Sequence, residues 1–289
     1  MAALRGAANG RRRLAPLLIL LALVLLGYWL RVHNLDAFSF WTDEGLTPER
    51  SGYPVAQILR NDILIQGVVT KDTHPPLYYL VIHLTRSLFG VSDFAFRYPS
   101  VLFGVLLIPL LYQFGRRLVP SPKIPSPNPS PREANQSPSP SGRGLGRGSS
   151  TLGLIVALLA VVNPLHVYYS QEARMYTLLA LLATGMSYVL WGAIATADGR
   201  PPTAAGRGAR EERSSPGTGN LEPGTSSGGR RSVVRGLFLY AALAALAVYT
   251  HYTAVFLVAA QAVFWGWLLW RAGLKWVIIG AVGLAALAA

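Results

Sequence analysis

Long apolar runs alternate with polar segments along the chain, and the lengths of these runs predict helices that cross a membrane. A helix needs about 17 to 25 mostly apolar residues to cross the hydrocarbon core of a bilayer. The runs that reach or approach this length are residues 14–30, 98–114, 152–169, 175–197, 236–270 and 276–289. The pattern predicts an all-α, polytopic integral membrane protein.

The run at 236–270 is too long for one span, because a single helix over these residues would measure about 50 Å. The polar sequence around His251 lies near its middle. We therefore expect two helices that turn at His251. This brings the expected number of spans to about seven, the last of them ending within the run 276–289.

Residues 76–89 are apolar, but a helix over them would be only about 21 Å long. The segment also contains His83 and Arg86, which a short span would have to bury in lipid. We interpret it as a helix that lies in the membrane interface instead of crossing the bilayer.

This interpretation fixes the orientation of the chain. With it, the N-terminus and both long polar segments share one side, which holds nineteen of the 26 lysines and arginines. By the positive-inside rule that side is cytoplasmic. No small-residue cleavage site follows residues 14–30, so we expect an uncleaved anchor in the plasma (inner) membrane. The segments expected to face outward are 31–97, 168–176 and the turn at His251.

Composition supports a membrane protein and argues against other classes. Hydrophobic residues make up 52% of the chain and charged residues only 13%, about half the usual share for a soluble domain. The net charge of +13 comes from basic residues in loops beside apolar runs, which does not indicate a nucleic-acid partner. The chain has no cysteine, so disulfides and thiolate-bound metals are excluded.

Two cytoplasmic segments have low-complexity sequences rich in Gly, Pro, Ser and Arg, which cannot bury an apolar core. We interpret both as disordered linkers. The expected divisions of the chain are a basic N-terminus at 1–13, a first span, catalytic outer loop and second span at 14–118, a linker at 119–150, two spans at 151–197, a second linker at 198–235 and the last spans at 236–289.

The outward segments contain the candidate chemistry. Carboxylates, basic groups and histidines cluster there, and ionisable residues at membrane depth are functional candidates by default. The candidate catalytic residues are Asp43, Glu44 and Glu172, and the candidate substrate-binding residues are Lys71, Asp72, His74, Arg174, Tyr176 and His251.

Four motifs in this order resemble the bacterial relatives of the protein O-mannosyltransferases, which include the lipid A aminoarabinose transferases. The motifs are Trp41-Thr42-Asp43-Glu44, Thr73-His74-Pro75-Pro76-Leu77-Tyr78-Tyr79, Leu88-Phe89-Gly90 with Phe96-Arg97-Tyr98-Pro99-Ser100, and Ser170-Gln171-Glu172-Ala173-Arg174-Met175-Tyr176. The resemblance implies the N-terminal part of a C-type glycosyltransferase helical bundle. It also implies a transferase that takes a sugar from a polyprenyl phosphate donor, with Asp43 at the catalytic centre, Glu44 beside it and Glu172 as a second acidic position.

Glycosyl transfer from a lipid phosphate needs a base for the acceptor proton and positive charge for the leaving phosphate. A carboxylate such as Asp43 suits the base, and Lys71 and Arg174 suit the phosphate. We expect a single displacement that inverts the anomeric centre. If a divalent metal ion takes part, Asp43 and Glu172 are its candidate ligands. The acceptor, whether protein, lipid or polysaccharide, stays open.

Other interpretations are open for the whole chain and for single residues. A transporter or lipid flippase is the competing class, and an inactive, truncated family member is a third possibility. Glu172 and Arg174 could form a structural ion pair, and His74 and His251 could be turn residues. The outward tyrosines, namely Tyr78, Tyr79, Tyr168, Tyr169 and Tyr176, fit an aromatic belt better than sugar-stacking surfaces. If the site exists, Asp43, Lys71, His74, Glu172, Arg174 and His251 are expected to line one outward cavity.

Overall fold

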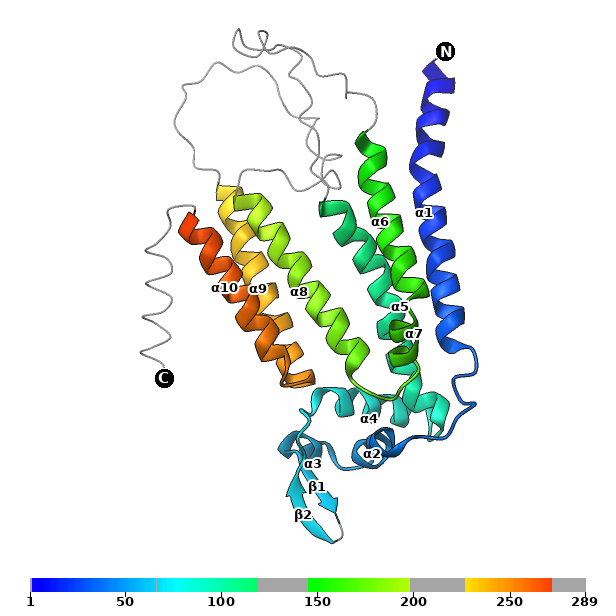
Figure 1. Cartoon of the computed structure of the whole chain (residues 1–289), viewed down its shortest axis with the longest axis vertical. Helices are drawn as coiled ribbons and strands as arrows, with labels where there is room; N and C mark the ends of the chain where they lie inside the picture. The colour runs from blue at the N-terminus through cyan, green and yellow to red at the C-terminus, as the bar shows by residue number, and fades with distance from the viewer. Residues whose placement is uncertain (1, 66, 119–144, 198–226, 272–289) are drawn as a thin grey trace.

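The computed structural model of the chain describes residues 2–65, 67–118, 145–197 and 227–271. Long helices run side by side, and short elements gather at one end of them (Figure 1). The long helices are α1 (Ala2–Val32), α5 (Asp93–Leu118), α6 (Leu145–Val162), α8 (Tyr176–Ala197), α9 (Ser227–Thr250) and α10 (Ala254–Arg271). The short elements are α2 (Thr42–Ser51), α3 (Val55–Arg60), β1 (Asp62–Ile65), β2 (Val68–Lys71), α4 (Leu77–Phe89) and α7 (Pro164–Ser170).

The mostly helical membrane architecture is confirmed. Among the described residues, Leu14–Val32 and Asp93–Leu118 are long and apolar enough to cross a bilayer, and α6 with α7 forms a third, bent candidate. Shorter apolar helices occupy Tyr176–Gly192, Arg235–Thr250 and Ala254–Trp267. The total of about seven spans stays a prediction, since residues 276–289 lie outside the described ranges. The chain turns at His251, between α9 and α10, where the sequence analysis places the turn.

The segment 152–169, expected to be a span, is not one straight helix. The chain bends by 60° between α6 and α7, at Asn163. Pro164 follows, and a residue before proline is pushed out of the helical region; Asn163 accordingly has φ −64° and ψ 116°. Its side chain then caps α7 by accepting a hydrogen bond from the backbone N–H of His166 at 3.1 Å. The Asn163-Pro164 pair thus accounts for the bend.

A buried arginine holds the bend in place. Arg31, at the end of α1, is fully buried and donates to the carbonyl oxygen of Ala160 at 2.8 Å and to the hydroxyl of Ser170 at 3.2 Å. A cation at a helix C-terminus interacts favourably with the carbonyls left without helical partners. Gly104 of α5 makes room, because a Cβ there would lie 2.2 Å from the Ser170 Oγ.

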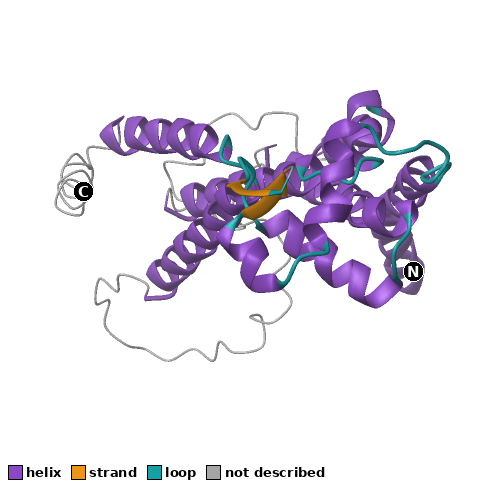
Figure 2. Ribbon diagram, turned by 90° about the horizontal axis from the view of Figure 1, so that it is seen from below, coloured by secondary structure: helices purple, strands orange, loops and turns teal. Residues whose placement is uncertain are grey.

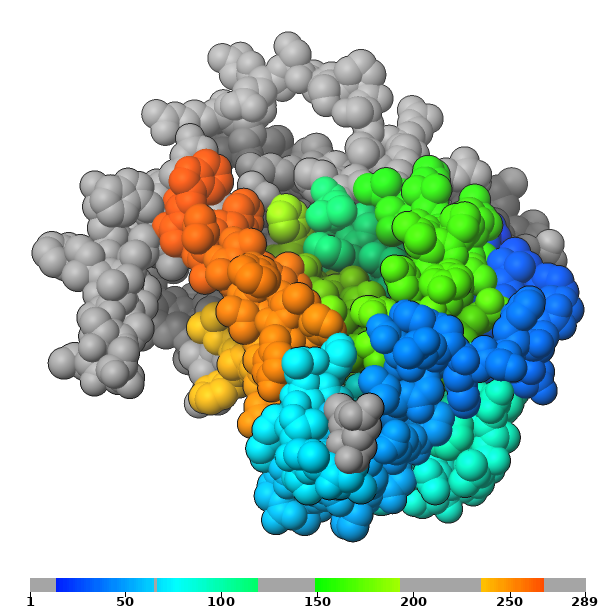
Figure 3. Space-filling model, turned by 60° about the horizontal axis from the view of Figure 1, so that its bottom comes forward, coloured from blue at the N-terminus to red at the C-terminus, as the bar shows by residue number. Residues whose placement is uncertain are grey.

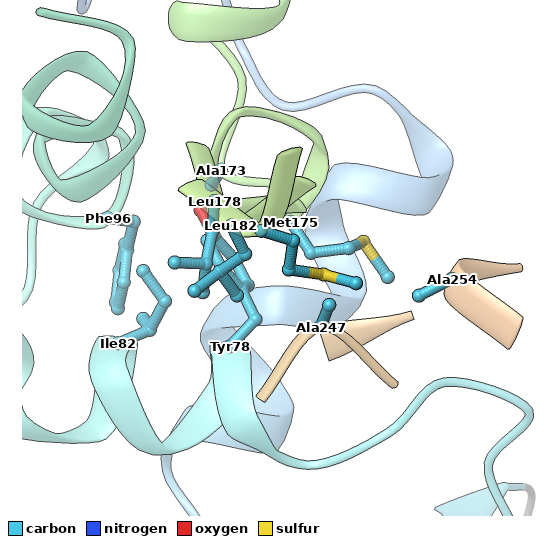
Figure 4. Packing of buried hydrophobic residues seen from close by; sticks show 10 residues of the cluster. Tyr78, Ile82, Phe96, Ala173, Met175, Leu178, Leu182, Ala247 and Ala254 are labelled. Atoms are coloured by element: carbon cyan, nitrogen blue, oxygen red, sulfur yellow. The ribbon is translucent and has the colours of Figure 1, made fainter. Parts of the chain in front are cut away.

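Two apolar clusters pack the bundle. One joins α5 and α6 around Ile108, Tyr112 and Val161, with α1 packed against it. The other joins α8 and α9 to α4, α5 and α10 (Figure 4). Its buried members include Tyr78, Ile82, Phe96, Ala173, Met175, Leu178, Leu182, Met186, Ala247 and Ala254. The second cluster matters for function because it fixes α4 and the 171–175 segment against the same helices.

The layer below the bundle holds α2, α3, α4 and an antiparallel hairpin of β1 and β2 (Figures 1 and 2). The hairpin was not predicted, since the sequence analysis expected helices alone in the first outer loop. Its β-branched residues, Ile63, Ile65, Val68 and Val69, favour strands, and Gly67 supplies the positive φ of 81° that the turn requires. Figure 3 shows this layer from its outer side, with α10 beside it.

Helix α4 lies across the end of the bundle in Figure 1 and starts directly after the proline pair, with Pro76 as its N-cap residue. Two of its tyrosines correct the aromatic-belt interpretation. Tyr78 is fully buried and hydrogen-bonded to Ser100 at 2.8 Å, and Tyr79 is buried beneath the guanidinium of Arg50, 3.8 Å from its ring centroid. Both tyrosines therefore pack the interior of the outer layer.

The boundaries of the two predicted linkers also need correction. Helix α6 begins at Leu145 and helix α9 at Ser227, so both helices extend into the segments 119–150 and 198–235 that the sequence analysis assigned to linkers. The rest of these segments, 119–144 and 198–226, lies outside the described residues.

Candidate active site

The first carboxylate pair divides between the interior and the surface. Glu44 is 1% exposed, and both of its oxygens bind Arg97, at 2.7 and 2.8 Å. It also accepts a hydrogen bond from the backbone N–H of Ala173 at 2.7 Å. Glu44 thereby ties α2 to α5 and to the 171–175 segment, and this geometry favours a positioning role over the predicted catalytic one.

Asp43 is exposed, and its carboxylate makes no hydrogen bond or ion pair with the part of the chain that the structure describes. Consecutive residues of an α-helix point about 100° apart, so the inward side chain of Glu44 leaves Asp43 facing out. The main-chain oxygen of Asp43 accepts a hydrogen bond from Arg174 at 2.9 Å. The carboxylate of Asp43, which is the predicted base, therefore has no partner among the described residues, whereas the main chain of the same residue contacts Arg174.

Arg174 is the central cation of the cluster. It is 2% exposed, its Nη2 lies 3.4 Å from Nε2 of His74, and its buried Nε has no partner. Within the described ranges, no carboxylate lies at salt-bridge distance from it, so the ion pair between Glu172 and Arg174, the alternative to a functional role, is not formed. A buried guanidinium without an ion-pair partner is costly and is well suited to bind an anion.

His74 is held by the carboxylate of Asp72. The backbone N–H of His74 donates to Oδ1 of Asp72 at 2.7 Å, and Nδ1 lies 3.0 Å from the same oxygen. The other carboxylate oxygen forms an ion pair with Arg50. Burial raises the pKa of the Asp72 carboxyl, but the hydrogen bonds from His74 and the charge of Arg50 together hold that pKa below its ordinary value. Asp72 is therefore a buried anion behind His74.

His251 reaches the cluster from the turn between α9 and α10. Its ring centroid lies 5.9 Å from that of His74, edge to face. The backbone N–H of Thr253 donates to its Nδ1 at 3.2 Å. Burial lowers the pKa of His251, and the neighbouring His74 and Arg174 lower it further. The neutral imidazole is thus the favoured form of His251.

Glu172 precedes Arg174 by two residues in the chain, and its side chain is buried, with 5% exposure. One of its carboxylate oxygens has no hydrogen-bond partner. Burial raises the pKa of Glu172 above its ordinary value, and the nearby charge of Glu44 adds to this. Tyr176 is half-buried, with its ring 6.0 Å from the guanidinium carbon of Arg174.

Lys71 does not join the other candidates. It lies on β2, mostly exposed, and its ammonium binds the carboxylate of Asp62 and the main-chain oxygen of Arg60. No contact in the described residues links it to Arg174 or His74. The structure thus brings Asp72, His74, Arg174 and His251 together, with the main chain of Asp43 bound to Arg174. It places Glu44, Glu172 and Tyr176 beside them and leaves Lys71 out.

Three residues of the site were given no role by the sequence analysis. Arg97 binds Glu44, Arg50 binds Asp72, and Asn61 donates to the main-chain oxygens of Asp72 and His74 at 3.2 and 2.9 Å. Arg97 lies within one of the four motifs, which is a signal that was available. Asn61 has a left-handed φ of 61°, which only a structure reveals.

In the ranges that the structure describes, no three histidine or carboxylate side chains lie close enough together to hold a metal ion. The two candidate ligands differ in their surroundings, since Asp43 is exposed and Glu172 is buried. A metal role for this pair has no further support in the geometry.

A comparison with known families agrees with the motifs. Residues 73–123 match the family model of dolichyl-phosphate-mannose-protein mannosyltransferase. The matched segment contains His74, the proline pair, α4 and Arg97. No curated protein and no solved structure matches the chain. The match supports a membrane glycosyltransferase of the mannosyltransferase type, which implies a lipid-linked sugar donor.

Proposed function

We propose that the protein transfers a sugar from a polyprenyl phosphate donor to an acceptor hydroxyl at the extracytoplasmic face of the plasma membrane. The observation that carries this proposal is Arg174, a buried guanidinium with no carboxylate partner that lies between the main chain of Asp43 and the imidazole of His74. A phosphate group would supply the missing negative charge. Charge-assisted hydrogen bonds from arginine to phosphate are among the strongest in proteins.

In the proposed reaction the acceptor oxygen forms a bond to the anomeric carbon of the sugar, and the bond from that carbon to the phosphate oxygen breaks. Asp43, exposed and unpartnered, takes the acceptor proton. Arg174 and His74 stabilise the charge that develops on the leaving polyprenyl phosphate. Among the described residues no carboxylate forms an ion pair with Arg174, and the proposed reaction is a single inverting displacement without a covalent sugar–enzyme intermediate.

The bend between α6 and α7 is the observation that would favour a transporter, since transporters bind ions at broken helices. Here the cation already present at the break is Arg31, which hydrogen-bonds the carbonyl oxygen of Ala160. Arg31 therefore already occupies the carbonyl oxygens at the break, and an enzyme is the better supported function.

The experiment uses the full-length gene product in membranes with a radiolabelled polyprenyl phosphate mannose. Asp43→Asn keeps the size of the side chain and removes its charge, so turnover should fall by about 10²–10⁴-fold, the usual contribution of a base. Asp36→Asn, an exposed aspartate of the same outer loop, is the matched control and should keep full turnover. Normal turnover by Asp43→Asn would remove Asp43 from the mechanism.

A second pair of variants tests the phosphate site. Arg174→Gln should raise the donor KM, because it removes the cation of the site. Lys71→Ala should leave the donor KM unchanged, because the Lys71 ammonium is bound to Asp62. The reverse result, a high KM for Lys71→Ala and a normal one for Arg174→Gln, would place the phosphate elsewhere.

A further inference from the structure

We propose that His74 takes up a proton when the phosphate of the lipid donor or product binds, so that binding is tighter at low pH. This inference rests on the proposed function, because it assumes that the anion binds at Arg174. It concerns the protonation of one imidazole, which the assignment of the reaction leaves open.

The first step is the tautomer of His74 in the empty site. Asp72 is an anion and can only accept hydrogen bonds, so the proton of the neutral imidazole is on Nδ1, 3.0 Å from its Oδ1. The other nitrogen, Nε2, then carries a lone pair, and Nη2 of Arg174 donates to it at 3.4 Å. In the empty site His74 is therefore an acceptor toward Arg174.

The second step is the arrival of a phosphate beside Arg174. An anionic oxygen there draws the guanidinium N–H groups toward itself and meets the lone pair of Nε2. Two acceptors facing each other repel, whereas a protonated Nε2 donates a hydrogen bond to the phosphate oxygen. The proton comes from solvent, and the carboxylate of Asp72 on the other side of the ring stabilises the imidazolium that results.

The charges around His74 give the direction of this coupling. Asp72 favours the imidazolium, while Arg174 and His251, which face His74 from the 171–175 segment and the α9–α10 turn, oppose it. A bound phosphate offsets the charge of Arg174 and so removes the main opposition. Breaking the bond between sugar and phosphate turns a phosphodiester into a phosphomonoester that can carry a second negative charge. The product therefore favours the imidazolium more than the donor does.

The loop that carries His74 is fixed before any ligand binds. Arg50 pairs with Asp72 and donates to the side-chain oxygen of Asn61 at 3.0 Å. Asn61 in turn donates to the main-chain oxygen of His74 at 2.9 Å. Asp72 and Asn61 are positioning residues in this scheme, since they act on the phosphate only through His74.

The test measures binding of polyprenyl phosphate to the purified full-length protein between about pH 5 and 8, the range in which histidine ordinarily titrates. The readout is the ligand-induced rise in melting temperature, which follows affinity. The second pKa of the phosphate itself is about 6, so the wild type is compared with His74→Gln at each pH. His74→Gln should bind more weakly than the wild type at low pH, and the ratio of the two Kd values should fall toward one as the pH rises, by at most about tenfold per pH unit, the limit for one linked proton.

Two further variants make the result specific. Asp72→Asn leaves His74 in place without its anion, so the rise of Kd should begin at lower pH. His83→Gln is the matched control, because His83 of α4 contacts the main-chain oxygen of Ser51 and not the cluster; it should keep the wild-type profile. A ratio of the His74→Gln and wild-type Kd values that does not change with pH would overturn the inference. Absence of sugar transfer at every pH would instead refute the proposed function.

Discussion

At the scale of single residues, Asp43 and Glu44 show how neighbours in one motif acquire different tasks. Both are carboxylates in the first turn of α2, yet one is exposed and the other binds Arg97 and the N–H of Ala173. The helix geometry separates them, and the long-range partner decides which of the two is buried. The sequence motif alone does not distinguish the role of Asp43 from that of Glu44.

This difference predicts opposite effects on stability. Glu44→Gln leaves Arg97 buried without its anion, and breaking a buried pair costs about 3–5 kcal/mol. Asp43→Asn changes an exposed, unpartnered side chain, so its effect on stability should stay within about 0.5 kcal/mol. Thermal unfolding of both variants in the same detergent measures this. Equal melting temperatures would mean that the ion pair between Glu44 and Arg97 contributes nothing to stability.

Glu172 predicts a pH dependence with a defined sign. Its pKa is raised in the fold by burial, so the folded state holds the proton more tightly than the unfolded state. The stability linked to this proton is fully present below the ordinary glutamate pKa and is lost as the pH rises through the raised one. At neutral pH the free energy of unfolding of Glu172→Gln should therefore exceed that of the wild type by on the order of 1 kcal/mol, and its melting temperature should be higher. The two proteins should converge in acid, and a constant difference across pH would contradict this account.

At the scale of elements, the bend between α6 and α7 positions the site. Helix α7 ends at Ser170, and the next four residues include Glu172 and Arg174. Arg31 and Ser170 fix that end against α1, while Gly104 leaves space for both on α5. The direction in which α7 leaves the bundle thus decides where Arg174 lies.

Gly104 offers a direct test of this packing. A methyl group there would lie 2.2 Å from the Ser170 Oγ, so Gly104→Ala should destabilise the protein by about 1–3 kcal/mol through overpacking. Ser170→Gly in the same chain removes the clashing hydroxyl and should recover part of the loss. Gly45→Ala, where nothing lies within 4 Å, is the control and should be neutral or stabilising. Full additivity of the Gly104 and Ser170 changes would show that the two positions do not interact.

The elements differ in how far the sequence predicts them. The lengths of the apolar runs and the polar residues between them were sufficient to predict the helices and the turn at His251, since both follow from local composition. The bend at Asn163 was missed although the Asn163-Pro164 pair encodes it, because the span was predicted from the apolar content of the whole run and not from this dipeptide. The hairpin was missed because four-residue strands are too short to show a period.

The candidate site was predictable as a set of residue types but not as a geometry. The contact between Glu44 and Arg97 joins residues 53 apart in the chain, and the contact between Arg174 and His74 joins residues 100 apart. Such pairs form only when the bundle is assembled, so spacing in the sequence cannot select Arg174 over Lys71. The choice depends on Asp62, which neutralises Lys71 on the hairpin.

At the scale of the whole molecule, the ends of the long helices separate two faces. The C-termini of α5 and α8 and the N-termini of α1, α6 and α9 lie at one end of the bundle, and the layer of α2, α3, α4 and the hairpin lies at the other (Figure 1). The candidate residues all belong to this second face. The arrangement is the one expected if the basic segments are cytoplasmic and the site is extracytoplasmic.

Cysteine labelling tests this orientation on a chain that has no native cysteine. Thr70→Cys introduces a thiol on the exposed strand β2, and Ser130→Cys introduces one in the basic segment between α5 and α6. In intact cells a membrane-impermeant maleimide should label Thr70→Cys and leave Ser130→Cys unlabelled until the membrane is opened, because the positive-inside rule holds the basic segment in the cytoplasm. The opposite pattern would turn the site toward the cytoplasm, where the proposed donor would have to present its sugar on the inner leaflet. Labelling of both thiols in intact cells would show that they share one side, so that the helices between them cross the membrane an even number of times.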